Sequence, residues 1–233
     1  MLIRTRSTGT GGKIMRSLVL LLLVSCNIQA TTLSDLLGDL NESAIVADKQ
    51  NGKLYVYDAS VPKISVTSAL FGKEHTDTYV LSDYDVEGKA GAITPAGTFT
   101  SSKLFSKRLN LPITAFVKGA QAFVAIHPVW LGKPAQRRIE RLNSPESTDN
   151  RITNGCVNIA PEFYYQVVDK LRSNTRVVIL PESDSVIDDV SSTLTVGTKV
   201  VVEKPKVTTQ YGAVPGYDEA SLAGETGSAG LNY

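Results

Sequence analysis

The sequence contains few of the residues from which metal centres and disulfide frameworks are built. Its 233 residues include two cysteines and two histidines, too few for a disulfide-rich scaffold or for a multi-cysteine or histidine-rich metal site. The chain also has no excess of charge of either sign, with 24 Lys and Arg against 23 Asp and Glu. Proteins that bind nucleic acid typically show a basic excess or patch, so we expect no nucleic-acid partner.

The apolar run SLVLLLLVSC at 17–26 is too short for a membrane span, which needs about 20 apolar residues. Basic residues and no acids precede it, and Ala30 provides a small-residue exit. This order is typical of a secretory signal. We therefore expect residues 1–30 to be a signal peptide, with Met15 as an alternative start, and the protein to be exported. A buried core helix is the other interpretation of the run.

The end of this run also resembles a bacterial lipobox, LVSC at 23–26, in which the cysteine becomes the lipidated first residue. Cleavage after Ala30 gives a periplasmic protein, whereas lipidation of Cys26 gives one anchored to the outer membrane. The sequence leaves both outcomes open. Either way, Cys156 has no second cysteine in the mature chain with which to pair.

After a connecting segment at 31–43, short β-rich runs separated by turn signals extend to residue 181. Asn51-Gly52 is the clearest of these signals, because both residues tolerate a positive φ. Such runs predict an all-β sandwich or barrel-like domain over 44–181. The runs expected to form strands are 44–48, 53–58, 63–70, 78–82, 97–104, 113–119, 123–129 and 175–180.

One helix is expected at 161–172. Pro161 suits its first turn, where the missing N–H costs nothing, and Phe163, Val168 and Leu171 fall on one face. Residues 182–233 are rich in small and polar residues and are expected to be a largely disordered tail, with one β-like run at 193–202.

Cys156 lies in the polar segment RITNGCVN at 151–158. An unpaired cysteine in an exported protein is a free reactive thiol or part of an intermolecular disulfide, and a small buried hydrophobe is the alternative. The polar neighbours favour a reactive thiol. Gly155 permits a tight turn whose N–H groups point at a developing oxyanion.

A thiol nucleophile needs a base, and His127 is the better of the two histidines because it ends a predicted strand. His75 lies in a polar loop without such support. An imidazole paired with the thiol is expected to lower the pKa of Cys156. Both histidines precede the cysteine, which excludes the papain-like order.

Three stretches together resemble the catalytic domain of the bacterial L,D-transpeptidases, over about residues 44–181. ITPAGTF at 93–99 is similar to the turn that precedes the site in that family, and His127 matches its upstream histidine. The family's cysteine motif, Ser or Thr, any residue, Gly, Cys, a hydrophobic residue, then Asn or Arg, is matched by Thr153, Gly155, Cys156, Val157 and Asn158.

The resemblance implies a β-sandwich or barrel-like fold and a reaction on peptidoglycan tetrapeptide stems. Cys156 would attack the stem and release D-Ala, with His127 as base, no metal or organic cofactor, and an amine of a second stem or of a wall-linked lipoprotein as acceptor. Hydrolysis as an L,D-carboxypeptidase or amidase is the first alternative. A sortase-like enzyme and a non-enzymatic wall-binding protein are the others.

The resemblance also implies roles for the neighbours of the cysteine. Thr153, Asn154 and Gly155 are expected to support the turn and the oxyanion, and Arg151 and Asn158 to bind substrate. An alternative role for Asn158 is to cap the helix that begins near residue 161.

The chain departs from the family at Asn154, where a second histidine is common, and at Pro128, where many members have glycine. It also has a longer segment between His127 and the cysteine. That segment contains Arg137, Arg138 and Arg141, which either meet substrate carboxylates or form a solvated face. Trp130 either walls the cleft or packs in the core.

Overall fold

The computed structural model describes residues 32–79, 91–118, 123–186 and 199–201. The expected signal peptide, Cys26 and most of the tail lie outside these ranges. No helix among the described residues is long and apolar enough to cross a membrane.

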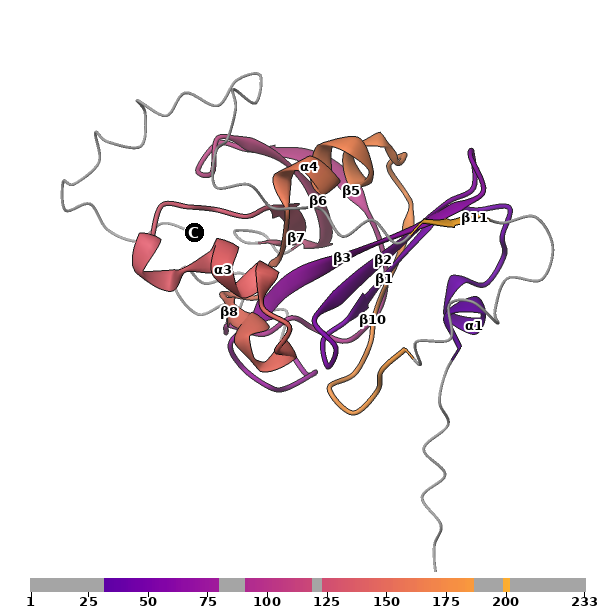
Figure 1. The fold of residues 1–233 in the computed structure, drawn as a ribbon. Helices are drawn as coiled ribbons and strands as arrows, with labels where there is room; N and C mark the ends of the chain where they lie inside the picture. Colours follow the sequence, from indigo (N-terminus) through magenta and orange to yellow (C-terminus); the bar gives the residue numbers. More distant parts are fainter. Residues whose placement is uncertain (1–31, 80–90, 119–122, 187–198, 202–233) are drawn as a thin grey trace, which may run out of the picture.

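Eleven strands in the described ranges form one sheet (Figure 1). Most of the expected strands are confirmed to within a few residues, but 97–104 is split at Ser101. Of the strand expected at 78–82, Thr78 and Tyr79 are not in a strand and the other residues lie outside the described ranges. The strands are β1 Ala44–Asp48, β2 Lys53–Asp58, β3 Lys63–Gly72, β4 Gly97–Thr100, β5 Ser102–Ser106, β6 Leu111–Lys118, β7 Phe123–Pro128, β8 Arg151–Thr153, β9 Val157–Ile159, β10 Arg176–Ile179 and β11 Lys199–Val201.

The helices of the described residues are short. The helix expected at 161–172 is interrupted at Val167, where φ is −121° and ψ −66°, and it resumes as a 3₁₀ turn. The α-helices are α1 Leu33–Leu37, α3 Arg138–Asn143 and α4 Pro161–Gln166, and the 3₁₀ turns are η1 Pro134–Gln136, η2 Ser147–Asn150 and η3 Val168–Lys170.

The sheet curls into a nearly closed barrel. Its strand order is β4-β10-β1-β2-β3-β9-β7-β6-β5, and the strands at its two ends, β4 and β5, are separated in the chain by Ser101 alone. Because one residue spans less than 4 Å, the two edges must lie close together. The expected all-β, barrel-like fold with few short helices is therefore confirmed.

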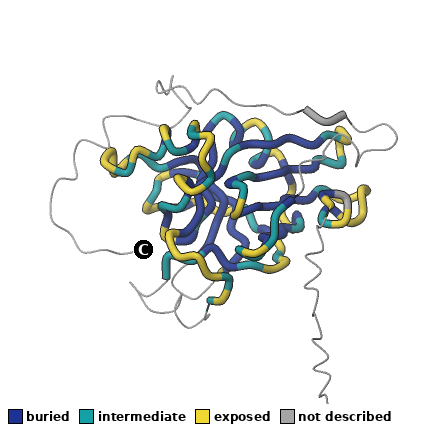
Figure 2. Tube along the Cα trace, turned by 60° about the horizontal axis from the view of Figure 1, so that its bottom comes forward, coloured by how far each residue is buried: buried dark blue, intermediate teal, exposed yellow. Residues whose placement is uncertain are grey.

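The strands at the centre of the sheet are buried on both faces, which explains their continuous apolar sequences. On the inner face, Ile45, Leu54 and Phe71 pack with the residues of α4. On the outer face, Leu33 and Leu37 of α1 cover the other side chains of β1 and β2. Figure 2 shows this buried interior along the Cα trace.

The segment between β7 and β8 forms a layer of its own beside β3. In α3, Ile139 and Leu142 are buried against Leu70 of β3 and Val129. Figure 1 shows α3 next to β8. This packing places the arginines of the long segment close to the strand that carries His127 and to the turn that carries Cys156.

Candidate active site

Cys156 lies in the turn between β8 and β9 and is half-buried. It is a free cysteine. The turn requires glycine before it, because Gly155 has a φ of +109° and a Cβ there would lie 2.5 Å from the Ile93 carbonyl oxygen. The absence of a side chain at Gly155 thus allows the backbone of the predicted 93–99 turn to pack directly against the cysteine turn.

Two buried threonines hold this turn. The Thr153 hydroxyl donates to the Cys156 carbonyl at 2.6 Å and accepts from the Gly155 N–H at 3.1 Å. The Thr94 hydroxyl donates to the Gly155 carbonyl at 2.8 Å. Thr153 therefore has the geometry of a supporting residue. The Gly155 N–H was expected to face an oxyanion, but in this conformation it donates to the Thr153 hydroxyl. The Asn154 side chain, expected to support the turn, is exposed.

His127 and Cys156 lie on the same face of the sheet. Strands β7 and β9 are parallel neighbours that pair Ile126 with Val157 and His127 with Asn158. Ile126 and Val157 point into the inner core, and side chains alternate along a strand, so His127 and Cys156 share the opposite face. Cys156 precedes β9 by one residue, which makes it a diagonal neighbour of the imidazole.

Both nitrogens of the His127 ring have hydrogen-bond partners. Nδ1 lies 2.7 Å from the Pro128 carbonyl oxygen, and Nε2 lies 3.0 Å from the side-chain nitrogen of Asn158. A carbonyl only accepts and an amide nitrogen only donates. This network therefore assigns the proton to Nδ1 and the lone pair to Nε2. Within the described ranges, no hydrogen bond joins His127 to Cys156.

Burial keeps both groups neutral at neutral pH. The pKa of His127 is lowered to about 4, chiefly by burial; the Pro128 carbonyl opposes this shift, and the nearby Arg138 and Arg108 contribute to it. Burial raises the pKa of Cys156, opposed by the Ala125 backbone and by the same two arginines. The lowered thiol pKa expected from the sequence is wrong for this state, because desolvation outweighs the neighbouring charges.

The Asn158 side chain is fully buried. Its oxygen accepts from Arg138 Nη1 at 2.5 Å while its nitrogen faces His127. The alternative role as a helix cap is wrong, since Ala160 is the N-cap of α4 and no side chain caps that helix. In this arrangement Asn158 contacts protein groups on both sides rather than an open surface.

Arg151, predicted to bind substrate, lies in a buried ionic cluster. Its Nη2 donates to the Glu74 carbonyl and to Glu182, and its side chain is 6% exposed. Glu182 and Asp77 also pair with the buried Lys49, whose ammonium donates to the Thr94 carbonyl at 3.0 Å. The cluster therefore supports the Thr94 backbone behind the cysteine turn.

The other charged candidates divide between the surface and the site. His75 is exposed and lies 3.8 Å from Glu182. Arg137 is exposed, and Arg141 donates to the carbonyls of Gln136 and Asp149. Of the three arginines in the long segment, Arg138 is the one that reaches the site. Sequence reasoning had no signal that distinguished it from its neighbours.

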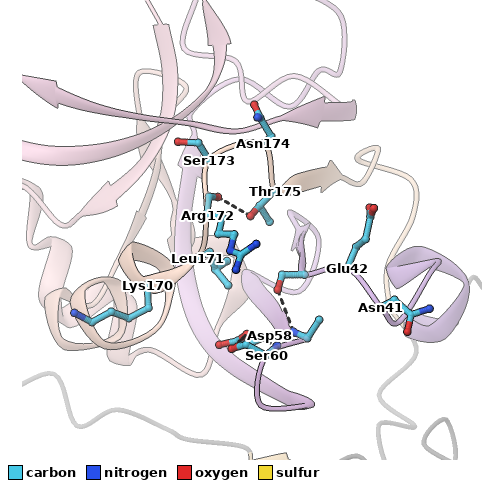
Figure 3. Close-up of a pocket in the computed structure, with 12 residues that line it drawn as sticks. Asn41, Glu42, Asp58, Ser60, Lys170, Leu171, Arg172, Ser173, Asn174 and Thr175 are labelled. Atoms are coloured by element: carbon cyan, nitrogen blue, oxygen red, sulfur yellow. Dashed lines mark hydrogen bonds between the residues drawn. The ribbon is translucent and has the colours of Figure 1, made fainter.

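A cleft of about 430 Å³ lies elsewhere, between the segments that precede β1, join β2 to β3 and precede β10. Figure 3 shows its polar lining, which includes Glu42, Asp58, Lys170 and Arg172. It contains neither a cysteine nor a histidine, so thiol chemistry is not located there. Among the residues that the structure describes, no group of three potential ligands could hold a metal ion.

The buried imidazole makes a pH-dependent contribution to stability. Its pKa is about 4 in the folded protein and about 6.5 when unfolded, so the contribution is complete above pH 6.5 and is lost as the pH falls towards 4. At about 1.4 kcal/mol per unit, the loss is about 3 kcal/mol. We expect wild type to lose this much more unfolding free energy than His127→Gln between pH 7 and pH 4, measured by denaturant titration. A constant difference would contradict the assignment.

No family model and no curated protein matches this sequence. Solved structures that resemble it include an L,D-transpeptidase from Xylanimonas cellulosilytica, 15% identical over 60% of this chain and 60% of that chain with a TM-score of 0.35. The catalytic domain of the Enterococcus faecium L,D-transpeptidase is 19% identical over 61% of this chain and all of that chain, with a TM-score of 0.34. An L,D-transpeptidase from Mycobacterium tuberculosis is 14% identical over 59% of this chain and 57% of that chain, with a TM-score of 0.36.

Proposed function

We propose that this protein is an exported, cysteine-dependent L,D-transpeptidase that acts on peptidoglycan tetrapeptide stems. The observation that carries the proposal is the placement of the Cys156 thiol, in a turn that only glycine permits, on the same sheet face as His127. The order of ITPAGTF, His127 and the cysteine motif supports the same reaction class.

The reaction begins when the Cys156 proton passes to Nε2 of His127, which must first release the Asn158 amide. The thiolate then attacks the carbonyl carbon of the third stem residue, and the Cys156 N–H is the candidate donor to the oxyanion. Collapse of this intermediate breaks the bond to the terminal D-Ala, whose amine takes the proton from the imidazolium. A thioester remains on Cys156.

The acceptor completes the cycle. An amine from a second stem, or from a wall-linked lipoprotein, attacks the thioester, loses a proton to His127 and forms the new amide as the thiol is restored. Water in place of the amine gives a carboxypeptidase on the same scaffold. Thr153 and Thr94 keep the turn in place throughout, because they donate hydrogen bonds to the two successive carbonyls of Gly155 and Cys156.

The test is incubation with a disaccharide-tetrapeptide, followed by mass spectrometry of products and intact protein. We expect release of D-Ala, a tripeptide adduct on Cys156 and cross-linked dimers, all absent from the Cys156→Ala protein. D-Ala release without dimers, at any concentration of acceptor, would identify the carboxypeptidase instead. Identical products from wild type and Cys156→Ala would refute both.

Export and anchoring are tested separately on the full chain. We propose that residues 1–30 direct export, and that the choice between periplasm and outer membrane depends on Cys26. Fractionation of cells expressing wild type and Cys26→Ser distinguishes the two outcomes: a membrane-bound wild type released by the substitution indicates lipidation, and a soluble wild type indicates cleavage after Ala30. A cytoplasmic wild type would contradict export.

A further inference from the structure

Arg138 belongs to the segment between His127 and Cys156, and its side chain extends from the start of α3 to Asn158. Nη1 donates to the Asn158 oxygen at 2.5 Å, and Nε donates to the Gln136 side chain at 2.8 Å. The guanidinium also lies 5.8 Å from the centre of the Trp130 ring. Three groups thus fix the position of this half-buried arginine.

The orientation of the Asn158 amide determines which form of His127 it can bind. The Pro128 carbonyl requires a proton on Nδ1 in either form, because it only accepts. The group opposite Nε2 therefore selects the protonation state. An amide N–H there binds the neutral ring, whereas an amide oxygen would bind the imidazolium.

Arginine has donors and no acceptor. While Arg138 contacts Asn158, the amide oxygen must face the guanidinium and the amide nitrogen must face the ring. Rotation of the amide would place two donors against each other on the arginine side, in a site where Asn158 is fully buried. The cost of leaving a buried polar group unpaired opposes this rotation.

We propose that Arg138 is a positioning residue for His127: it fixes the Asn158 amide with its nitrogen towards Nε2 and thereby keeps the imidazole unprotonated, with its lone pair on Nε2. The catalytic meaning rests on the proposed function, in which this nitrogen takes the Cys156 proton. The long segment between His127 and Cys156 thus supplies an arginine that acts on His127 through Asn158. The charged groups that act on the ring are Arg138 and Arg108.

The first test is an NMR titration of the two histidines in the folded protein without substrate, with His75→Gln to assign the signals. We expect His127 to remain neutral and protonated on Nδ1 well below pH 6. Arg138→Met, which removes charge and donors, is expected to raise the pKa of His127 by about one to two units. Arg138→Lys, which keeps the charge and a donor group without an acceptor, should stay near wild type, as should the neighbouring control Arg137→Met.

A double-mutant cycle separates action through Asn158 from simple charge repulsion. We expect Arg138→Met to shift the His127 pKa much less in an Asn158→Leu background, because the side chain that transmits the effect is absent. Equal shifts in both backgrounds would overturn the proposal, and so would a wild-type imidazole that is charged, or protonated on Nε2 alone, at pH 6. That wild-type measurement can overturn the proposal even if the variants fail to fold.

No substrate enters these measurements, so the two proposals fail separately. The predicted titration without D-Ala release would refute the transpeptidase alone. Products that require Cys156, together with equal shifts in both backgrounds, would refute the positioning role alone.

Discussion

His127→Gln is expected to lower the rate of acyl-enzyme formation by about 10²–10⁴-fold, the usual contribution of a general base, without unfolding the protein. Glutamine can keep both hydrogen bonds of the imidazole, since its amide nitrogen can donate to the Pro128 carbonyl and its oxygen can accept from Asn158. It cannot take a proton from the thiol. The rate is measured by intact-protein mass spectrometry during incubation with stem tetrapeptide.

The pH dependence of this defect identifies its cause. Burial raises the pKa of Cys156, so little thiolate is present at neutral pH without a base. At higher pH the thiol ionises by itself, and the deficit of His127→Gln should shrink. His75→Gln, at an exposed position, is the matched control and should match wild type. A His127→Gln protein with a wild-type rate at pH 7 would exclude the imidazole as base.

The fold was predictable where one residue pattern determines one element. Strands β1 and β2 have continuous apolar runs joined by Asn51-Gly52, and they form at the expected residues. The strands β8 and β9 were not predicted, because three residues are too few to show a period. Helix α3 was missed because its six residues carry four charged or polar side chains and two buried apolar ones, a weak helical signal.

The candidate site was only partly predictable for a related reason. Local sequence indicated Cys156 and His127 as candidates, and the turn signal of Gly155 agrees with its observed φ. The partners of His127 depend on tertiary placement: Asn158 faces it across the β7–β9 pair, and Arg138 arrives from a separate helix. The direction of the thiol pKa was mispredicted because burial, which sequence context does not quantify, dominates it.

Gly155→Ala is expected to destabilise the protein by about 2–4 kcal/mol, the combined size of backbone strain and a steric clash. A φ of +109° lies outside the conformations that alanine readily adopts, and the new Cβ would lie 2.5 Å from the Ile93 carbonyl oxygen. The Ile93 carbonyl cannot easily move away from the new Cβ. The next residue, Thr94, is fully buried and is bonded to the Gly72 N–H and the Gly155 carbonyl.

The substitution should also reduce acylation, because any relief of the clash moves the turn that carries Cys156. Chemical denaturation and the acylation assay measure the two effects. Gly91→Ala is the matched control in the facing segment: its Cβ would meet only the end of the Ile93 side chain, at 3.2 Å, so a change within about 1 kcal/mol is expected. A Gly155→Ala protein as stable and as active as wild type would mean that the cysteine does not need this turn. That result would contradict the geometry from which the function of the site is proposed.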